Sequence, residues 1–177
     1  PGAPLFMVIG RLFSFFAAPE NVAVWMNRLS GISSSFSILF MFWSISILLR
    51  NIVGSSETLT TSKGQAILGS ALVGSLAFAF TDSFWFNAVE TEVYAMATLI
   101  MAIMFYLGLR WEQDMHKPRG NKWLILIAFV TGLSFGVHFM GLLTIPAIGL
   151  IYFFKNYKTV TVKNFIIANV AVVAILL

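Results

Sequence analysis

Long apolar runs separated by short polar segments form the dominant pattern of this sequence. Such runs predict transmembrane helices, because a helix needs about 20 mostly apolar residues to cross the hydrocarbon core. Predicted spans cover about residues 22–49, 64–81, 88–109, 123–137, 139–154 and 164–177. The pattern therefore predicts an all-α, polytopic transmembrane helical bundle that forms one domain over residues 1–177.

Two apolar segments need a separate interpretation. The run 123–154 extends about 48 Å at 1.5 Å per residue, which exceeds a hydrocarbon core of about 30 Å. We therefore place a break at Gly136-Val137-His138. Segment 1–18 opens with a Pro-Gly-x-Pro turn signal and carries Arg11 near its middle. These features favour a helix that lies in the membrane interface over a crossing.

Composition supports the membrane assignment and excludes other classes of protein. The chain is 59% hydrophobic and only 10% charged, whereas soluble domains have about 25% charged residues. The net charge of +4 comes from basic residues spread over short loops, so nucleic acid is not an expected partner. The absence of cysteine excludes a disulfide framework. With one histidine inside a span, the sequence does not predict a metal site.

The charged residues predict which loops share a side of the membrane. If the loops alternate in side, one side holds nearly all of the basic residues: Arg50, Lys63, Arg110, Lys117, Arg119, Lys122, Lys155, Lys158 and Lys163. The other side holds Arg11 and Arg28, together with the acidic Glu20, Asp82, Glu90 and Glu92. The positive-inside rule places the basic side in the cytoplasm and the acidic segment 82–92 on the outer face.

The acidic segment 82–92 carries the first candidates for chemistry. A carboxylate beside hydrocarbon is costly, so we expect Asp82, Glu90 and Glu92 at the water interface or in a polar cavity. On a helix, Glu90 and Glu92 would point about 200° apart and would not form a carboxylate pair. Asn87-x-x-Glu90 also resembles a capping box, which would give Glu90 a structural role. Asp82 is either a solvated acid or a partner for a cation or for an acceptor hydroxyl.

A histidine and two arginines are the remaining candidates on the outer face. His138 lies within the longest apolar run. A histidine there is often simply buried and hydrogen-bonded, but a polar group in a span is also a functional candidate. Arg11 and Arg28 either anchor the chain to lipid phosphate or bind the phosphate of a lipid-linked substrate, for which a guanidinium is well suited.

Five short motifs resemble signatures of a known family. They are Pro1-Gly-Ala-Pro-Leu-Phe6, Asn27-Arg-Leu-Ser30, Thr81-Asp-Ser-Phe-Trp85, Ala88-Val-Glu-Thr-Glu-Val-Tyr-Ala95 and Gly132-Leu-Ser-Phe-Gly-Val-His138. The family, DUF2723, comprises bacterial polytopic membrane proteins common in Bacteroidetes. It is similar to an animal transmembrane protein O-mannosyltransferase and, more distantly, to the protein mannosyltransferases of the GT-C superfamily.

This resemblance implies a GT-C-like fold and a glycosyltransferase of the bacterial inner membrane. Such an enzyme transfers a sugar, for example mannose, from a polyprenyl-phosphate donor to a protein or glycan acceptor on the periplasmic face. The resemblance also implies a longer chain, whose catalytic base lies in an outer loop before Pro1. Membrane lipid, the lipid-linked donor and a protein acceptor are the expected partners; no cofactor is evident, and a need for a divalent metal stays open.

The candidate residues fall into two groups. Glu90, Glu92 and His138 are candidates for catalysis, and Arg28, Asp82, Asn27 and Arg11 for substrate binding. Two alternatives remain at this point. A transporter or flippase would carry polar groups at mid-depth and inverted repeats, and a structural membrane subunit would carry carboxylates that are only solvated.

Overall fold

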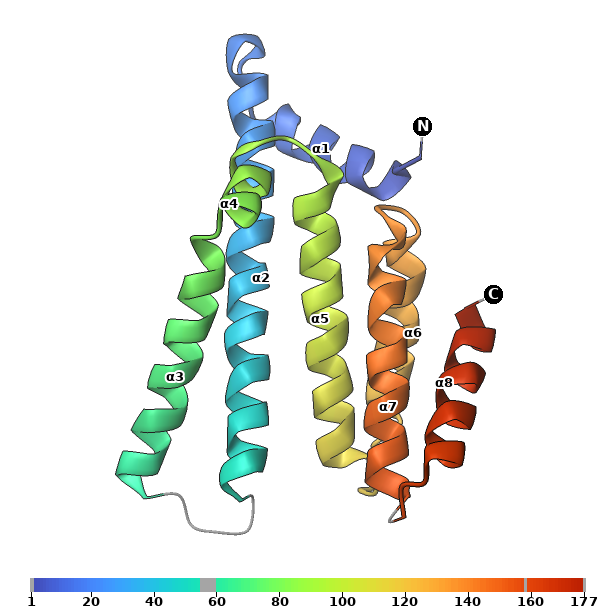
Figure 1. Cartoon of the computed structure of the whole chain (residues 1–177). Helices are drawn as coiled ribbons and strands as arrows, with labels where there is room; N and C mark the ends of the chain where they lie inside the picture. The colour runs from blue at the N-terminus through green and yellow to red at the C-terminus, as the bar shows by residue number, and fades with distance from the viewer. Residues whose placement is uncertain (1, 55–59, 158, 177) are drawn as a thin grey trace.

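The computed structural model describes residues 2–54, 60–157 and 159–176, and the described chain is built of helices. Long helices run side by side as a bundle, and α1 crosses one end of it (Figure 1). The helices are α1 (Pro4–Phe15), α2 (Val22–Val53), α3 (Thr61–Ala79), α4 (Asp82–Val89), α5 (Val93–Asp114), α6 (Lys122–Ser134), α7 (Ile145–Asn156) and α8 (Val162–Leu176), with short 3-10 helices η1 (Pro19–Asn21) and η2 (Phe139–Thr144). This architecture confirms the predicted all-α helical membrane bundle.

Three helical segments are long and apolar enough to cross a membrane: Pro19–Val53, Val93–Asp114 and Phe139–Asn156. The bent pair of α3 and α4 would make a fourth. Helix α6 corresponds to the predicted span 123–137 but has only 13 residues, or about 20 Å at 1.5 Å per residue. The break expected at residues 136–138 is present, because α6 ends at Ser134 and η2 begins at Phe139.

Segment 82–92 departs from the prediction of a loop followed by a span from Ala88. Residues Asp82–Val89 form α4, which bends away from α3 by 68°. Phe84 explains the position of α4, because its side chain is buried against Phe78 of α3 with ring centroids 4.8 Å apart. The third predicted span therefore begins at Val93 rather than at Ala88, and it ends at Asp114 rather than near 109.

Helix α5 forms the centre of the bundle, since it packs against α2, α6, α7 and η2. Its side chains Ala97, Met104 and Leu107 are buried in the core. Helix α2 packs closely through a stripe of buried serines at helical spacing, Ser30, Ser33, Ser34 and Ser37. Small residues of this kind let helices approach closely in lipid.

The two ends of the bundle differ in charge. At the end that we call the basic end, Glu112 of α5 accepts from Asn51 of α2 at 3.2 Å and pairs with Lys155 of α7 at 3.1 Å. The turn 115–121 lies at the same end, whereas Lys158 lies outside the described residues. At the opposite end, which we call the acidic end, α1 lies beside the α4–α5 loop and the α6–η2 turn (Figure 1).

Candidate active site at the acidic end

The α4–α5 loop displays the two glutamates in extended backbone. Glu90 has φ −106° and ψ 147°, and Glu92 has φ −137° and ψ 162°. The Glu92 N–H donates to the Glu90 carbonyl at 3.1 Å. Both residues are exposed. Because neither glutamate is helical, the angle of about 200° predicted between them on a helix does not apply.

The capping-box interpretation of Glu90 is wrong. Asn87 lies inside α4, and its side-chain amide donates to the Ser83 carbonyl at 2.9 Å. Helix α5 instead begins after Glu92, whose side chain makes no capping hydrogen bond. The Glu92 carboxylate is stabilised by its location at the amino end of α5, where the helix dipole favours negative charge. Within the described residues, neither glutamate side chain makes a hydrogen bond or an ion pair.

Helix α2 brings two more candidates to this loop. Thr91 is the residue between the two glutamates, and its hydroxyl donates a hydrogen bond to Asn27 Oδ1. The neighbouring Arg28 is exposed, and its guanidinium lies over the Trp25 ring at 5.1 Å. Within the described part of the chain, Arg28 forms no ion pair with a carboxylate. Its charge is therefore available to an anionic ligand.

His138 joins the same cluster from the α6–η2 turn. Its ring lies 5.4 Å from the ring of Tyr94, two residues after Glu92. Its Nδ1 accepts a hydrogen bond from the Met140 N–H at 3.2 Å. A neutral imidazole that accepts at Nδ1 carries its proton on Nε2, which can then donate to a ligand. His138 is half-buried.

Helix α1 fastens the α6–η2 turn and places Arg11 at the acidic end. The N–H groups of Leu5 and Phe6 donate to the Gly136 carbonyl at 2.7 and 3.3 Å. Helix α1 crosses α2 where Gly10 lies against Met26. Arg11 is the next residue of α1 after this contact, and Arg28 lies two residues after Met26 in α2. Arg11 is exposed. The crossing therefore places the backbone of Arg11 and of Arg28 within two residues of the contact between α1 and α2.

Asp82 is the candidate that the structure keeps apart. It begins α4 and is exposed, whereas Glu90 follows the last residue of that helix. The eight residues of α4 separate them by about 12 Å along the helix axis. Glu90, Glu92, Asn27, Arg28 and His138 thus lie at the acidic end, where contacts link the glutamate loop to Asn27 and Tyr94 to His138. We call these five residues the cluster; Arg11 lies at the same end, and Asp82 is not among them.

An apolar groove along α5 was not predicted from the sequence. A cavity of about 390 Å³ lies between α2, α5, η2 and α7, and a second one of about 480 Å³ shares Leu48, Phe105 and Ala147 with it. The polar lining of the first cavity includes Ser37 and Ser44 of α2. The spacing of serines along α2 is the signal in the sequence that could have indicated it.

The fold and the cluster define a class: an integral membrane helical bundle with acidic, basic and imidazole groups gathered at one end. Residues 1–161 match the family model of the protein O-mannosyl-transferase TMEM260 N-terminal domain. The chain therefore belongs to this family of protein O-mannosyltransferase-like proteins. No curated protein and no solved structure matches the chain significantly. The closer resemblance to DUF2723 and the GT-C superfamily stays a prediction.

Proposed function

We propose that this chain is part of a membrane glycosyltransferase that transfers a sugar, mannose in the first instance, from a polyprenyl-phosphate donor to a protein. Transfer takes place at the acidic end, which we assign to the periplasmic face of a bacterial inner membrane. The observation that carries this proposal is the gathering of Glu90, Glu92, Arg28 and His138 from three separate segments. Family membership supports the same reaction.

The reaction needs a proton acceptor and cations, and the cluster supplies both. We assign the proton acceptor to Glu90 or Glu92, in place of the base before Pro1 that the family resemblance implies. The carboxylate takes the proton from the acceptor hydroxyl, whose oxygen bonds to the anomeric carbon of the sugar. The bond from that carbon to the phosphate oxygen breaks, and its electrons leave with the polyprenyl phosphate. Arg28, with Arg11, stabilises the phosphate, and the Nε2–H of His138 donates to a sugar or phosphate oxygen.

The apolar groove supports a lipid-linked donor. It begins beside Thr98 and Thr144, below the acidic end, and continues along α5 towards the basic end. Its apolar lining suits a prenyl chain, because the chain passes from the hydrocarbon of the bilayer to a surface of similar polarity and gains van der Waals packing there. A donor in this groove would present its phosphate towards the acidic end.

The test is transfer activity of single variants in the full-length protein. The test variants are Glu92→Gln, Glu90→Gln and Arg28→Gln. The control is Glu20→Gln, which removes an exposed carboxylate of η1 at the same end. At least one of the glutamate variants should lose about 100-fold or more in transfer from polyprenyl-phosphate mannose. Arg28→Gln should weaken donor binding, and Glu20→Gln should retain normal transfer. Normal transfer by all three test variants would reject the assignment of the site.

One observation favours an alternative, a structural membrane subunit. Glu90 and Glu92 are exposed, as expected for carboxylates that are only solvated. A full-length protein that folds and inserts but transfers no sugar would support that alternative. A transporter receives no such support, because the buried polar side chains of the described residues are serines and a threonine, without an ionisable group.

A further inference from the structure

A second cavity with two arginines lies at the basic end, away from the proposed active site. It has a volume of about 330 Å³ and lies between α2, α3 and α5. Arg50 ends the apolar part of α2, and Arg110 and Gln113 come from the last turns of α5. The rest of the lining is small or mostly apolar: Ser46, Ile47, Gly64, Ile67 and Leu68. The cavity thus combines basic groups with an apolar wall.

Arg110 has a donor that no protein group satisfies. Its Nε is buried and has no hydrogen-bond partner among the described residues. Its Nη1 makes only a long contact of 3.5 Å to the Tyr106 hydroxyl, and the guanidinium lies 5.2 Å from the Trp123 ring centroid. The guanidinium of Arg110 thus has donor capacity that no described residue uses, and an anion in the cavity would take it up.

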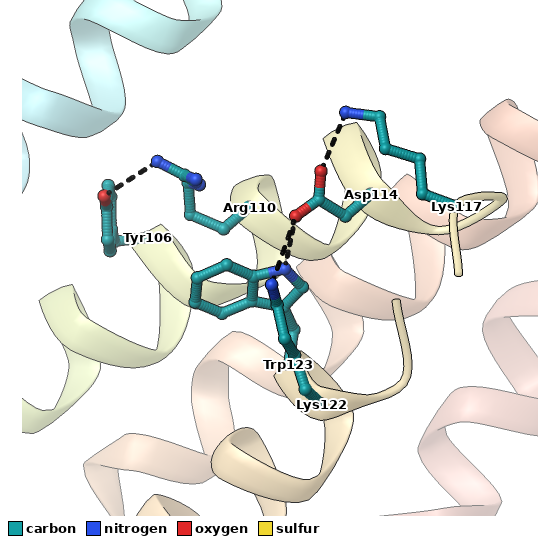
Figure 2. A network of polar contacts seen from close by, with 6 residues as sticks. All are labelled: Tyr106, Arg110, Asp114, Lys117, Lys122 and Trp123. Atoms are coloured by element: carbon teal, nitrogen blue, oxygen red, sulfur yellow. Dashed lines mark hydrogen bonds and ion pairs between the residues drawn. The ribbon is translucent and has the colours of Figure 1, made fainter. Parts of the chain in front are cut away.

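The described carboxylates at the basic end, Glu112 and Asp114, are engaged with other residues. Asp114 binds Lys117 at 2.9 Å and the Trp123 Nε1–H at 2.8 Å (Figure 2). Glu112 binds Asn51 and Lys155. Within the described ranges, Arg50 and Arg110 therefore have no carboxylate to neutralise them. Two cations in one cavity repel each other, and an anion between them would remove this repulsion.

We propose that this cavity binds the headgroup phosphate of an anionic phospholipid. The two guanidinium groups bind the phosphate oxygens, the Gln113 amide binds the glycerol part of the headgroup, and an acyl chain lies on the exposed side chain of Leu68. The cavity lies at the helix ends, at the level where lipid phosphates meet the hydrocarbon. The ligand is thus a lipid of the leaflet at the basic end, and the proposal is independent of sugar transfer.

The experiment uses the full-length protein and native mass spectrometry. Phosphatidylglycerol is titrated against phosphatidylcholine of the same chain length, and glycerol phosphate without acyl chains forms a separate arm. The variants are Arg50→Gln with Arg110→Gln, and Arg50→Lys with Arg110→Lys. Arg119→Gln is the matched control, because it removes an exposed cation of the same end that does not line the cavity.

We expect the wild type to prefer phosphatidylglycerol. The double glutamine variant should lose on the order of tenfold in affinity for it, whereas the double lysine variant should keep most of the preference and Arg119→Gln all of it. Equal affinity of the double glutamine variant and the wild type would overturn the proposal. Binding of glycerol phosphate as tightly as the lipid would overturn the assignment to a lipid. Thermal unfolding of each variant identifies any loss of binding that is caused by misfolding.

Discussion

Gly136 is the residue on which the contact between α1 and the α6–η2 turn depends. Its carbonyl accepts from the first N–H groups of α1, and a Cβ at this position would lie 2.7 Å from Leu5 Cβ. This distance is too short for two carbon atoms, and Leu5 Cβ cannot move without the helix backbone. A side chain of any size at residue 136 therefore pushes α1 away from the turn that carries His138.

We expect Gly136→Ala to lower the stability of the full-length protein by about 1–3 kcal/mol through overpacking. Thermal unfolding in detergent measures this effect. Gly132→Ala is the matched control, because a Cβ at residue 132 meets nothing within 4 Å and alanine is the better helix former by about 1 kcal/mol. Equal melting temperatures for the two variants would show that α1 does not pack on Gly136.

At the scale of the helices, hydrophobic runs predicted where most helices lie but not where they bend. The start of α2 and the break before His138 follow from polarity, and the structure has both. Helix α4 was missed because Phe84 is held by a tertiary contact with Phe78, and a local pattern carries no such information. Asn27 lies beside the glutamate loop because α2 packs against α4. The sequence could therefore identify these residues as candidates, but it could not predict that they are in contact.

Helix α3 shows the same limit for its buried face. Small residues occur all along α3, but Ala71 and Ser75 are buried whereas Gly69 and Ser70 are exposed. The buried residues lie four apart and face α2, the main partner of α3. Small residues on the other face can lie against lipid just as well, so residue size alone did not distinguish the two faces.

Ala71→Leu therefore tests which face of α3 packs on α2. Ala71 is fully buried, and the three added carbon atoms should cost about 1–3 kcal/mol by overpacking. Ala66→Leu makes the same change at an exposed position of α3 and should leave stability nearly unchanged. Thermal unfolding of the two full-length variants compares them. A larger loss for Ala66→Leu would mean that α3 presents its opposite face to α2.

For the whole molecule, the separation of charge between the two ends determines where the proposed chemistry takes place. The α4–α5 loop and the α6–η2 turn lie at the acidic end, whereas the α5–α6 turn and the end of α7 lie at the opposite end (Figure 1). The first two carry Glu92 and His138, and the last two carry Lys117 and Lys155. The positive-inside rule predicts that the acidic end faces away from the cytoplasm, and we propose that this side is the periplasm. A lipid-linked donor can be used at the acidic end only if that end faces the compartment to which the donor is delivered.

The absence of cysteine from the sequence allows a direct test of this orientation. Ser83→Cys labels the acidic end and His116→Cys the basic end, and both positions are exposed. In a full-length protein without other reactive cysteines, a membrane-impermeant thiol reagent applied from the periplasmic side should label residue 83 directly. Residue 116 should be labelled only after the inner membrane is permeabilised. The reverse pattern would place Glu92 and His138 in the cytoplasm, where the proposed periplasmic transfer cannot take place.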